Sequence, residues 1–262
     1  MQYIKNSDLR VQIIEMICRS GEGHIPSSFS IVDIVEFLYS NILKFDSKNP
    51  KFLERDFFIL SKGHGAAALY AVLEKHGFLT SADTFLYGNL RGILGGHPDS
   101  TKVPGVEAST GSLGHGLPMA TGIALGLKIQ TRLNKVYCLV GDGECQEGTV
   151  WESANIASNQ KLDNLTVIVD WNGSARQLMP VENLEARWNS FGWATCIADG
   201  HDDVSLSAAL TFLNNSSSEK PKVVIAQTVK GRGVPLLEGH GAWHHKIPNK
   251  EELTQIMSAL NG

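Results

Sequence analysis

The sequence predicts an α/β fold, a doubly wound and mostly parallel sheet with helices on both faces. Short apolar segments rich in β-branched residues recur along the chain and are typical of buried parallel strands. Helical or loop segments separate them, and that alternation is typical of a doubly wound sheet. The predicted strands cover residues 57–60, 136–140, 165–169, 194–197 and 223–229.

Helices are predicted between and around these strands. Residues 6–8 can cap a first helix that should end near Gly21. Its apolar positions fall on one face: Leu9, Ile13, Met16 and Ile17. Further helices are predicted over about residues 30–41, 65–75 and 251–260.

Length and charge restrict the possible roles. A chain of 262 residues is near the upper size of one α/β domain, so we expect a single domain over residues 1–262. With 23 basic and 27 acidic residues and no basic cluster, nothing in the sequence indicates a nucleic acid or an anionic membrane as a partner. No apolar run approaches the ~18 residues of a membrane span. The four scattered cysteines favour reduced thiols and a cytoplasmic location, without a zinc site.

Two polar motifs follow predicted strands directly. Asp142 lies in a Gly-Asp-Gly-Glu turn, and Asn172 follows 30 residues later in Asp-Trp-Asn-Gly. Ligands of open α/β sheets bind outside the carboxyl ends of the strands, and carboxylate and amide oxygens suit Mg²⁺ with a phosphate ligand. Gly143 lacks a Cβ where a diphosphate would approach, and a helix after the turn could offer its amides. The alternative is a helix cap at Asp142 and an ordinary turn at Asn172.

Many of the nine histidines stand beside glycine, as in residues 63–65 and 96–97. Histidine titrates near neutrality, so a histidine cluster could move protons at a bound ligand. His76, His201 and His245 lack this context and are interpreted as surface or structural residues. The roles of His115 and His240 stay open.

The motif region resembles the signature of thiamine diphosphate enzymes, and of transketolases in particular. The resemblance rests on the run from Gly141 through residues 151–152 and 161–165 to Asn172. Similar stretches follow the family's order over nearly the whole chain, at residues 23–27, 60–65, 96–98, 109–114, 228–233 and 243–244. The resemblance implies the diphosphate-binding, amino-terminal part of a transketolase, which transfers a two-carbon ketol unit from a ketose to an aldose.

The same resemblance implies roles for individual residues. The Mg²⁺ ligands would be Asp142, Asn172 and the carbonyl of Ser174, with Ca²⁺ or Mn²⁺ as possible substitutes. The cofactor would also contact Gly143 and the following residues: Ser27, His64, Gly111, Ser112, Leu113, Lys230 and His244. His24 and His97 would bind the ketose end, His64 would touch both substrate and cofactor, and His244 would assist proton transfer. Glu147 and Glu152 would link two active sites through a subunit interface.

The resemblance also implies a partner. In transketolases the glutamate that activates the cofactor lies in a pyrimidine-binding domain, which we do not find before Gly262. We therefore expect this domain and the C-terminal domain on a second subunit, in an α2β2 assembly acting on sugars or sugar phosphates. Trp171, residues 173–177 and His115 depart from the family pattern. The alternatives are half of another thiamine diphosphate enzyme, either 2-oxo acid decarboxylating or deoxyxylulose-phosphate synthase-like, and a non-catalytic binding relative.

Overall fold

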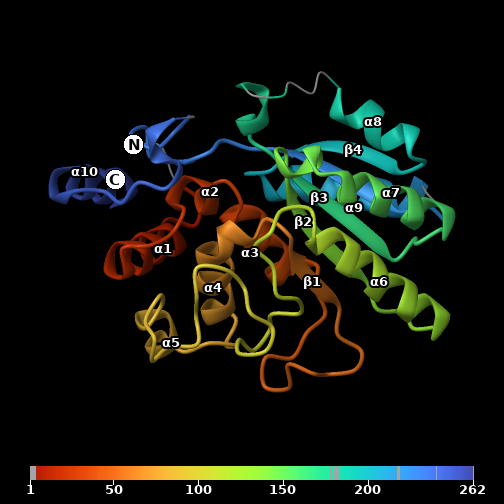
Figure 1. Ribbon diagram of the computed structural model, residues 1–262, viewed down its shortest axis with the longest axis horizontal. Helices are drawn as coiled ribbons and strands as arrows, with labels where there is room; N and C mark the ends of the chain where they lie inside the picture. Colours follow the sequence, from red (N-terminus) through yellow and green to blue (C-terminus); the bar gives the residue numbers. More distant parts are fainter. Residues whose placement is uncertain (1–3, 178, 180–182, 217–218, 240, 262) are drawn as a thin grey trace.

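The computed structural model describes residues 4–177, 179, 183–216, 219–239 and 241–261. Within them, five strands form one parallel sheet in the order β1-β2-β3-β5-β4 (Figure 1). The strands are β1 Phe57–Leu60, β2 Val136–Gly141, β3 Leu165–Trp171, β4 Ala194–Asp199 and β5 Lys222–Gln227. Both the predicted fold class and the five predicted strands are confirmed.

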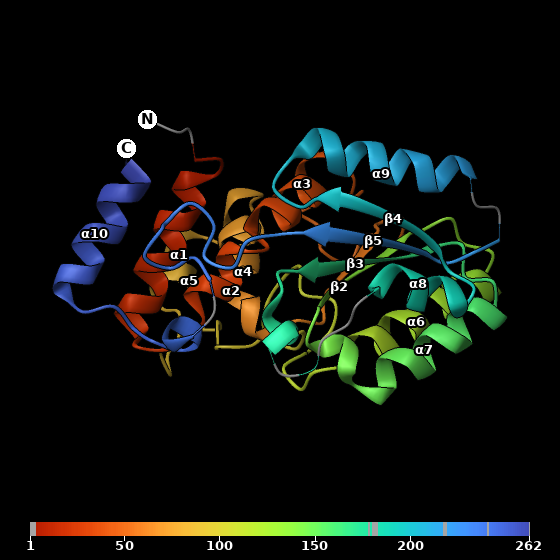
Figure 2. The same ribbon diagram turned by 90° about the horizontal axis from the view of Figure 1, so that it is seen from above.

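Helices cover both faces of the sheet (Figure 2). On one face α3 Val32–Asn41 and α9 Asp203–Ser216 pack over alternate strand residues such as Leu139, and this core extends into α1 Ser7–Ser20 and α4 Ala66–Lys75. On the other face α6 Gly116–Ile129, α7 Gly148–Asn159 and α8 Leu184–Ser190 pack over the intervening residues, such as Cys138. Successive strand side chains point to opposite faces, so strands that are apolar throughout supply both cores.

The carboxyl ends of the strands point toward a group of helices at one end of the molecule (Figure 2). This group contains α1, α2 Ile25–Phe29, α4 and the terminal helix α10 Lys250–Asn261, and α5 Ser81–Phe85 contacts α4. None of the helices in the described ranges has both the length and the apolar character needed to cross a membrane. Loops from distant parts of the chain meet between this helix group and the carboxyl ends of the strands.

The helix expected over about 30–41 is confirmed as α3. The short helix α2 before it was not predicted, and at its end the Ser30 hydroxyl donates to the Ser27 carbonyl and to Asp170. Two other details differ from the prediction. Asn6 does not cap α1 with its side chain, which donates to Asp33 at 2.8 Å. The last strand ends at Gln227, where the chain leaves the sheet toward α2. The predicted end of α1 is confirmed, since Gly21 has a φ of 72°.

Candidate functional site

A cavity of about 450 Å³ opens at the carboxyl ends of β2 and β3. Its walls come from separate stretches of the chain, around residues 27, 62–64, 113, 141–144, 172–175, 230 and 241–244. The predicted site residues among them are Ser27, His64, Leu113, Asp142, Gly143, Asn172, Ser174, Lys230 and His244. The sheet edge predicted from the sequence is therefore the edge that carries the cavity.

Asp142 and Asn172 meet because β2 and β3 are neighbours in register. Gly141 pairs with Asp170, and the Asp142 amide donates to the Asp170 carbonyl at 3.1 Å. The loop after β3 then folds back over the turn after β2. The amide of Ser174 donates to the Asn172 side-chain oxygen at 2.9 Å, and the amide of Ala175 donates to the Asp142 carboxylate at 3.3 Å. These bonds hold the loop that carries Asn172 against the turn that carries Asp142.

The electrostatics of Asp142 fit a cation at this place. Burial and the nearby Asp170 carboxylate raise the pKa of Asp142, against the opposing effect of two backbone amides. A bound divalent cation would remove this penalty and would accept carboxylate, amide and carbonyl oxygens as ligands. No group of three or more His, Cys, Asp or Glu side chains in the described residues could hold a metal ion, so a metal site here needs the amide and carbonyl oxygens of residues 172–174.

Two lysines also line the cavity. Lys230 lies within 3.1 Å of the His244 ring, and burial together with Lys62 lowers the pKa of Lys230. Lys62 was not predicted as a site residue. Its ammonium is buried, donates to the Ser27 carbonyl at 2.9 Å and pairs with Asp170 at 2.5 Å. The third donor of Lys62 goes to the Ser30 hydroxyl at 3.0 Å, so its charge and hydrogen bonds are used within the protein. Lys230 is the ammonium group placed to bind an anion such as a diphosphate.

Glu144 is a second residue that the sequence analysis missed. Its buried carboxylate accepts hydrogen bonds from the Ser61 hydroxyl and from the amides of Gly114 at 2.8 Å and Gly141 at 3.0 Å. Burial nevertheless raises the pKa of Glu144. By joining three loops that line or flank the cavity, Glu144 gives the cavity its shape. Its position in the same turn as Asp142 was the available signal.

Three predicted histidines gather at the cavity. The ring of His24 lies 5.2 Å from His64 and 5.0 Å from His244, and His24 Nδ1 lies 2.9 Å from the His244 carbonyl. Burial lowers the pKa of His64 to about 2 and that of His24 to about 4. Both rings are therefore neutral at physiological pH and can act as hydrogen-bond donor and acceptor. His245, expected outside the site, is exposed but has its ring 4.8 Å from His24 and joins this cluster.

His97 and part of the 111–113 turn lie beside the cavity and not on its wall. His97 is exposed, and a Cβ on Gly111 would stand 3.1 Å from its ring, so the two segments are in contact. Gly111 in turn packs on Gly63, next to His64. Of the turn, only Leu113 lines the cavity, while Ser112 is exposed.

The acids after the turn do not line the cavity. A short 3₁₀ helix, Glu144–Gln146, follows Gly143, and α7 begins at Gly148. Glu147 precedes α7 with extended backbone, Glu152 lies within it, and both side chains are exposed. Their role at a subunit interface stays a prediction.

The remaining histidines have mixed outcomes. His115 is exposed at the start of α6, and His240 lies outside the described residues. His76 contacts Glu36 at 3.1 Å and His201 contacts Asp33 at 2.7 Å, so the structural interpretation of these two is confirmed.

Comparison with known proteins identifies the family. A family model described as the transketolase thiamine diphosphate binding domain matches residues 4–261. The chain belongs to the transketolase family. The expected family, its transferase class and thiamine diphosphate as the cofactor are thereby confirmed, and the other thiamine diphosphate enzymes are not favoured.

Relatives of the transketolase chain match most of its length. One of the subunits of the apulose-4-phosphate transketolase of Phocaeicola vulgatus is 36% identical over 257 residues, covering 96% of this chain and 91% of that protein. The 6-deoxy-6-sulfo-D-fructose transketolase subunit SqwG of a Clostridium species is 35% identical, covering 90% and 88%. The crystal structure of Campylobacter jejuni transketolase superposes with a TM-score of 0.90 at 31% identity over 97% of this chain. This chain spans 41% of that solved transketolase.

Proposed function

We propose that this chain is the diphosphate-binding subunit of a two-component transketolase. With a partner subunit it would transfer a two-carbon ketol unit from a ketose to an aldose. The observation that carries the proposal is the cavity, which brings the oxygen atoms of Asp142 and Asn172 together with the Lys230 ammonium, with the histidine cluster at hand. A metal–diphosphate group needs this combination of oxygen ligands and an ammonium group.

The residues around the cavity have proposed tasks. Asp142, Asn172 and the Ser174 carbonyl would hold Mg²⁺, with Ca²⁺ or Mn²⁺ able to replace it. Lys230 would bind the diphosphate, while Lys62 holds Asp170 in place. Gly143 has an ordinary φ of −67° and open space where a Cβ would stand, so its absent side chain leaves room for the ligand. When bound, thiamine diphosphate supplies a carbanion equivalent that accepts the two-carbon unit.

The histidines would handle the sugar. His24 and His64 are neutral, so each can donate a hydrogen bond to a substrate oxygen or accept one from a hydroxyl without carrying charge into the cavity. His244, next to Lys230 and His24, is placed to exchange protons with a substrate hydroxyl. His97, with His24, would bind the ketose end of the substrate.

We also propose that the partner subunit recognises an anionic group on the sugar substrate. Both subunit relatives named above carry a sugar with an anionic group in their names, a phosphate in one and a sulfo group in the other. Among the described residues of the cavity wall, the lysines and arginines are Lys62, which pairs with Asp170, and Lys230, which the diphosphate would use. A basic residue for the sugar's own anion would then lie on the partner, in an α2β2 assembly in the cytoplasm.

The test combines a pull-down with a binding measurement. A tagged chain purified from native extract should bring down a stoichiometric partner together with thiamine diphosphate. Asp142→Ala should weaken cofactor binding at least 100-fold in the presence of Mg²⁺, while Asp203→Ala, an exposed carboxylate paired with Lys5, should leave it unchanged. Retained cofactor affinity in Asp142→Ala would refute the metal assignment. A chain that brings down neither partner nor cofactor would favour the non-catalytic relative.

A further inference from the structure

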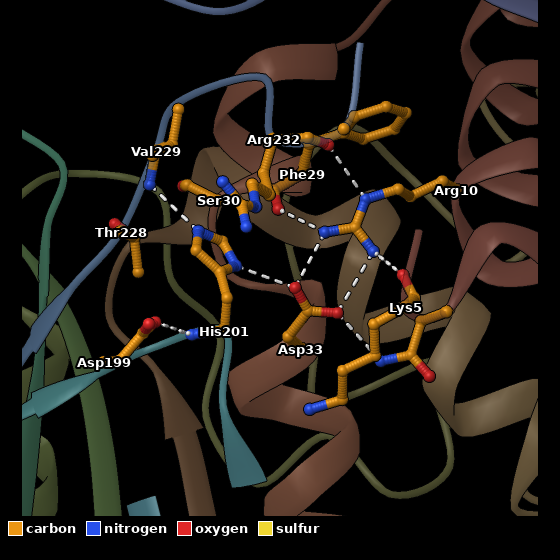
Figure 3. A network of polar contacts seen from close by, with 12 residues as sticks. Lys5, Arg10, Phe29, Ser30, Asp33, Asp199, His201, Thr228, Val229 and Arg232 are labelled. Carbon is orange, nitrogen blue, oxygen red and sulfur yellow. Dashed lines mark hydrogen bonds and ion pairs between the residues drawn. The ribbon is translucent and has the colours of Figure 1, made fainter. Parts of the chain in front are cut away.

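Arg10, Asp33 and His201 form a buried polar network between α1, α3 and the loop after β4 (Figure 3). The Arg10 guanidinium binds both oxygens of Asp33, at 3.1 and 2.8 Å, and both side chains are 1% exposed. On its other side, Asp33 lies 2.7 Å from His201 Nδ1. Burial alone would raise the pKa of Asp33, but His201 and Arg10 hold it well below the usual range.

The network ends on the main chain of the segment after β5. The amide of Val229 donates to His201 Nε2 at 2.9 Å, and Arg10 Nε donates to the Arg232 carbonyl at 3.1 Å (Figure 3). Lys230 lies between these two anchored residues, and its side chain lines the cavity. The network therefore binds the backbone on both sides of the site lysine.

The rest of this segment is also held closely. The Gly231 amide donates to the Pro26 carbonyl at 3.0 Å, and the Lys230 carbonyl accepts from Gly239 at 3.1 Å. Gly231 has a φ of +81°, and a Cβ on it would stand 2.1 Å from the Leu237 carbonyl oxygen, so only glycine fits there. Because the main chain around Lys230 is held at several points, the position from which its side chain extends into the cavity is fixed.

The hydrogen-bond directions make the arrangement specific. Because the Val229 amide is a donor, His201 Nε2 must accept, and the ring hydrogen must lie on Nδ1 and point to Asp33. Asp33 in turn holds this tautomer and is itself paired with Arg10. A buried charged network of this kind is a costly way to stabilise a fold but a good way to define one geometry.

We propose that His201 is a positioning residue for the diphosphate site. Oriented by Asp33 and Arg10, it holds the Val229 amide and thereby aims Lys230 at the diphosphate. This inference rests on the proposed function, since it assumes that Lys230 binds the cofactor's diphosphate. His201 lies outside the cavity wall, and its effect on the site passes through the backbone of the neighbouring loop.

Two substitutions separate the two hydrogen bonds of His201. The side-chain amide of His201→Asn reaches the position of Nδ1 and can still donate to Asp33, but it is too short to accept from Val229. In His201→Gln the amide oxygen reaches the position of Nε2 and can accept from Val229. We expect His201→Asn to weaken thiamine diphosphate binding about tenfold, the effect of one lost buried hydrogen bond, and His201→Gln to stay within about threefold of wild type.

The measurement is the dissociation constant of thiamine diphosphate with Mg²⁺, by calorimetry on the cofactor-free chain together with its partner subunit. Thermal unfolding of each variant is recorded beside it. His76→Asn is the matched control, because His76 also pairs with a carboxylate, that of Glu36, but follows α4 at the end opposite His64. This control should leave the affinity unchanged.

A thermodynamic cycle with Lys230→Met decides whether His201 acts through the lysine. In the Lys230→Met background, His201→Asn should cause no further loss of affinity. If His201→Asn lowers the affinity tenfold both in wild type and in Lys230→Met, the proposal is overturned. It is also overturned if His201→Gln weakens cofactor binding while His201→Asn does not. If Asp142→Ala and Lys230→Met themselves leave the affinity unchanged, the proposed function fails and the positioning role fails with it. If they weaken binding while His201→Asn does not, only the positioning role is refuted.

Discussion

Removal of the Lys62 ammonium should destabilise the fold strongly, because it strands the Asp170 carboxylate in the interior. The two side chains are 3% and 0% exposed, with nitrogen and oxygen 2.5 Å apart. At an effective dielectric constant of about 20, the attraction at that separation is roughly 7 kcal/mol, most of which offsets the cost of burying the two charges. Loss of one partner of a buried pair costs about 3–5 kcal/mol, and we expect this for Lys62→Met.

The pH dependence of the loss tests the cause. Burial would raise the pKa of Asp170, but Lys62 and the surrounding hydrogen bonds bring it below its usual value. In wild type this depressed pKa contributes stability that is present above the unfolded value, near 3.9, and is lost as pH falls below it. In Lys62→Met the pKa of Asp170 should rise above the unfolded value, so protonation would then favour the folded state. The loss of unfolding free energy in Lys62→Met, relative to wild type, should therefore be smaller at pH 4 than at pH 7.

Urea unfolding followed by circular dichroism at both pH values provides the measurement. Lys161→Met is the control, because Lys161 forms an exposed pair with Glu219 at 2.8 Å and its removal should have little effect at either pH. A second variant, Lys62→Met with Asp170→Asn, should recover much of the lost stability at pH 7. A deficit of Lys62→Met that is the same at pH 7 and pH 4 would show that a stranded carboxylate is not its cause.

Three further predictions concern the same site. Glu144→Gln should lower the unfolding free energy by about 2–4 kcal/mol, measured by urea unfolding, because an amide cannot accept from all three donors that bind the carboxylate. The pKa of His64 is lowered to about 2, chiefly by burial, so its neutral form contributes stability that is present above the unfolded value near 6.5 and declines as pH falls below it; His64→Gln should flatten that decline in a pH series of urea midpoints. Chelation of divalent cations should abolish thiamine diphosphate binding in calorimetry, and Mg²⁺, Ca²⁺ or Mn²⁺ should restore it.

The fold was predictable because its signals are local. Each strand is a short run of β-branched or apolar residues, and each run ends at a turn motif that the parallel arrangement brings to one edge. The short helix α2 was not predicted in this way. Its end is held by a distant contact, in which the Ser30 hydroxyl donates to the Asp170 carboxylate, 140 residues away.

The missed residues of the site have the same explanation. Lys62 and Glu144 lie inside the motifs that were used, but their importance comes from burial and from partners far away in sequence. Lys62 is 108 residues from Asp170, and Glu144 is 83 residues from Ser61. Local patterns reveal which segments end at the ligand-binding edge, and tertiary contacts decide which charges are enclosed there.

The charges around the cavity favour ligand binding more than the stability of the unliganded chain. Burial and a neighbouring carboxylate raise the pKa of Asp142, while burial and a neighbouring ammonium lower that of Lys230. Each group is therefore partly uncompensated by its own neighbours, in contrast to Asp170 and Asp33, which are fully paired. A cation at Asp142 and an anion at Lys230 would relieve both penalties together. The buried pairs at Asp170 and Asp33 hold the surrounding loops in place, so that Asp142 and Lys230 both line the cavity.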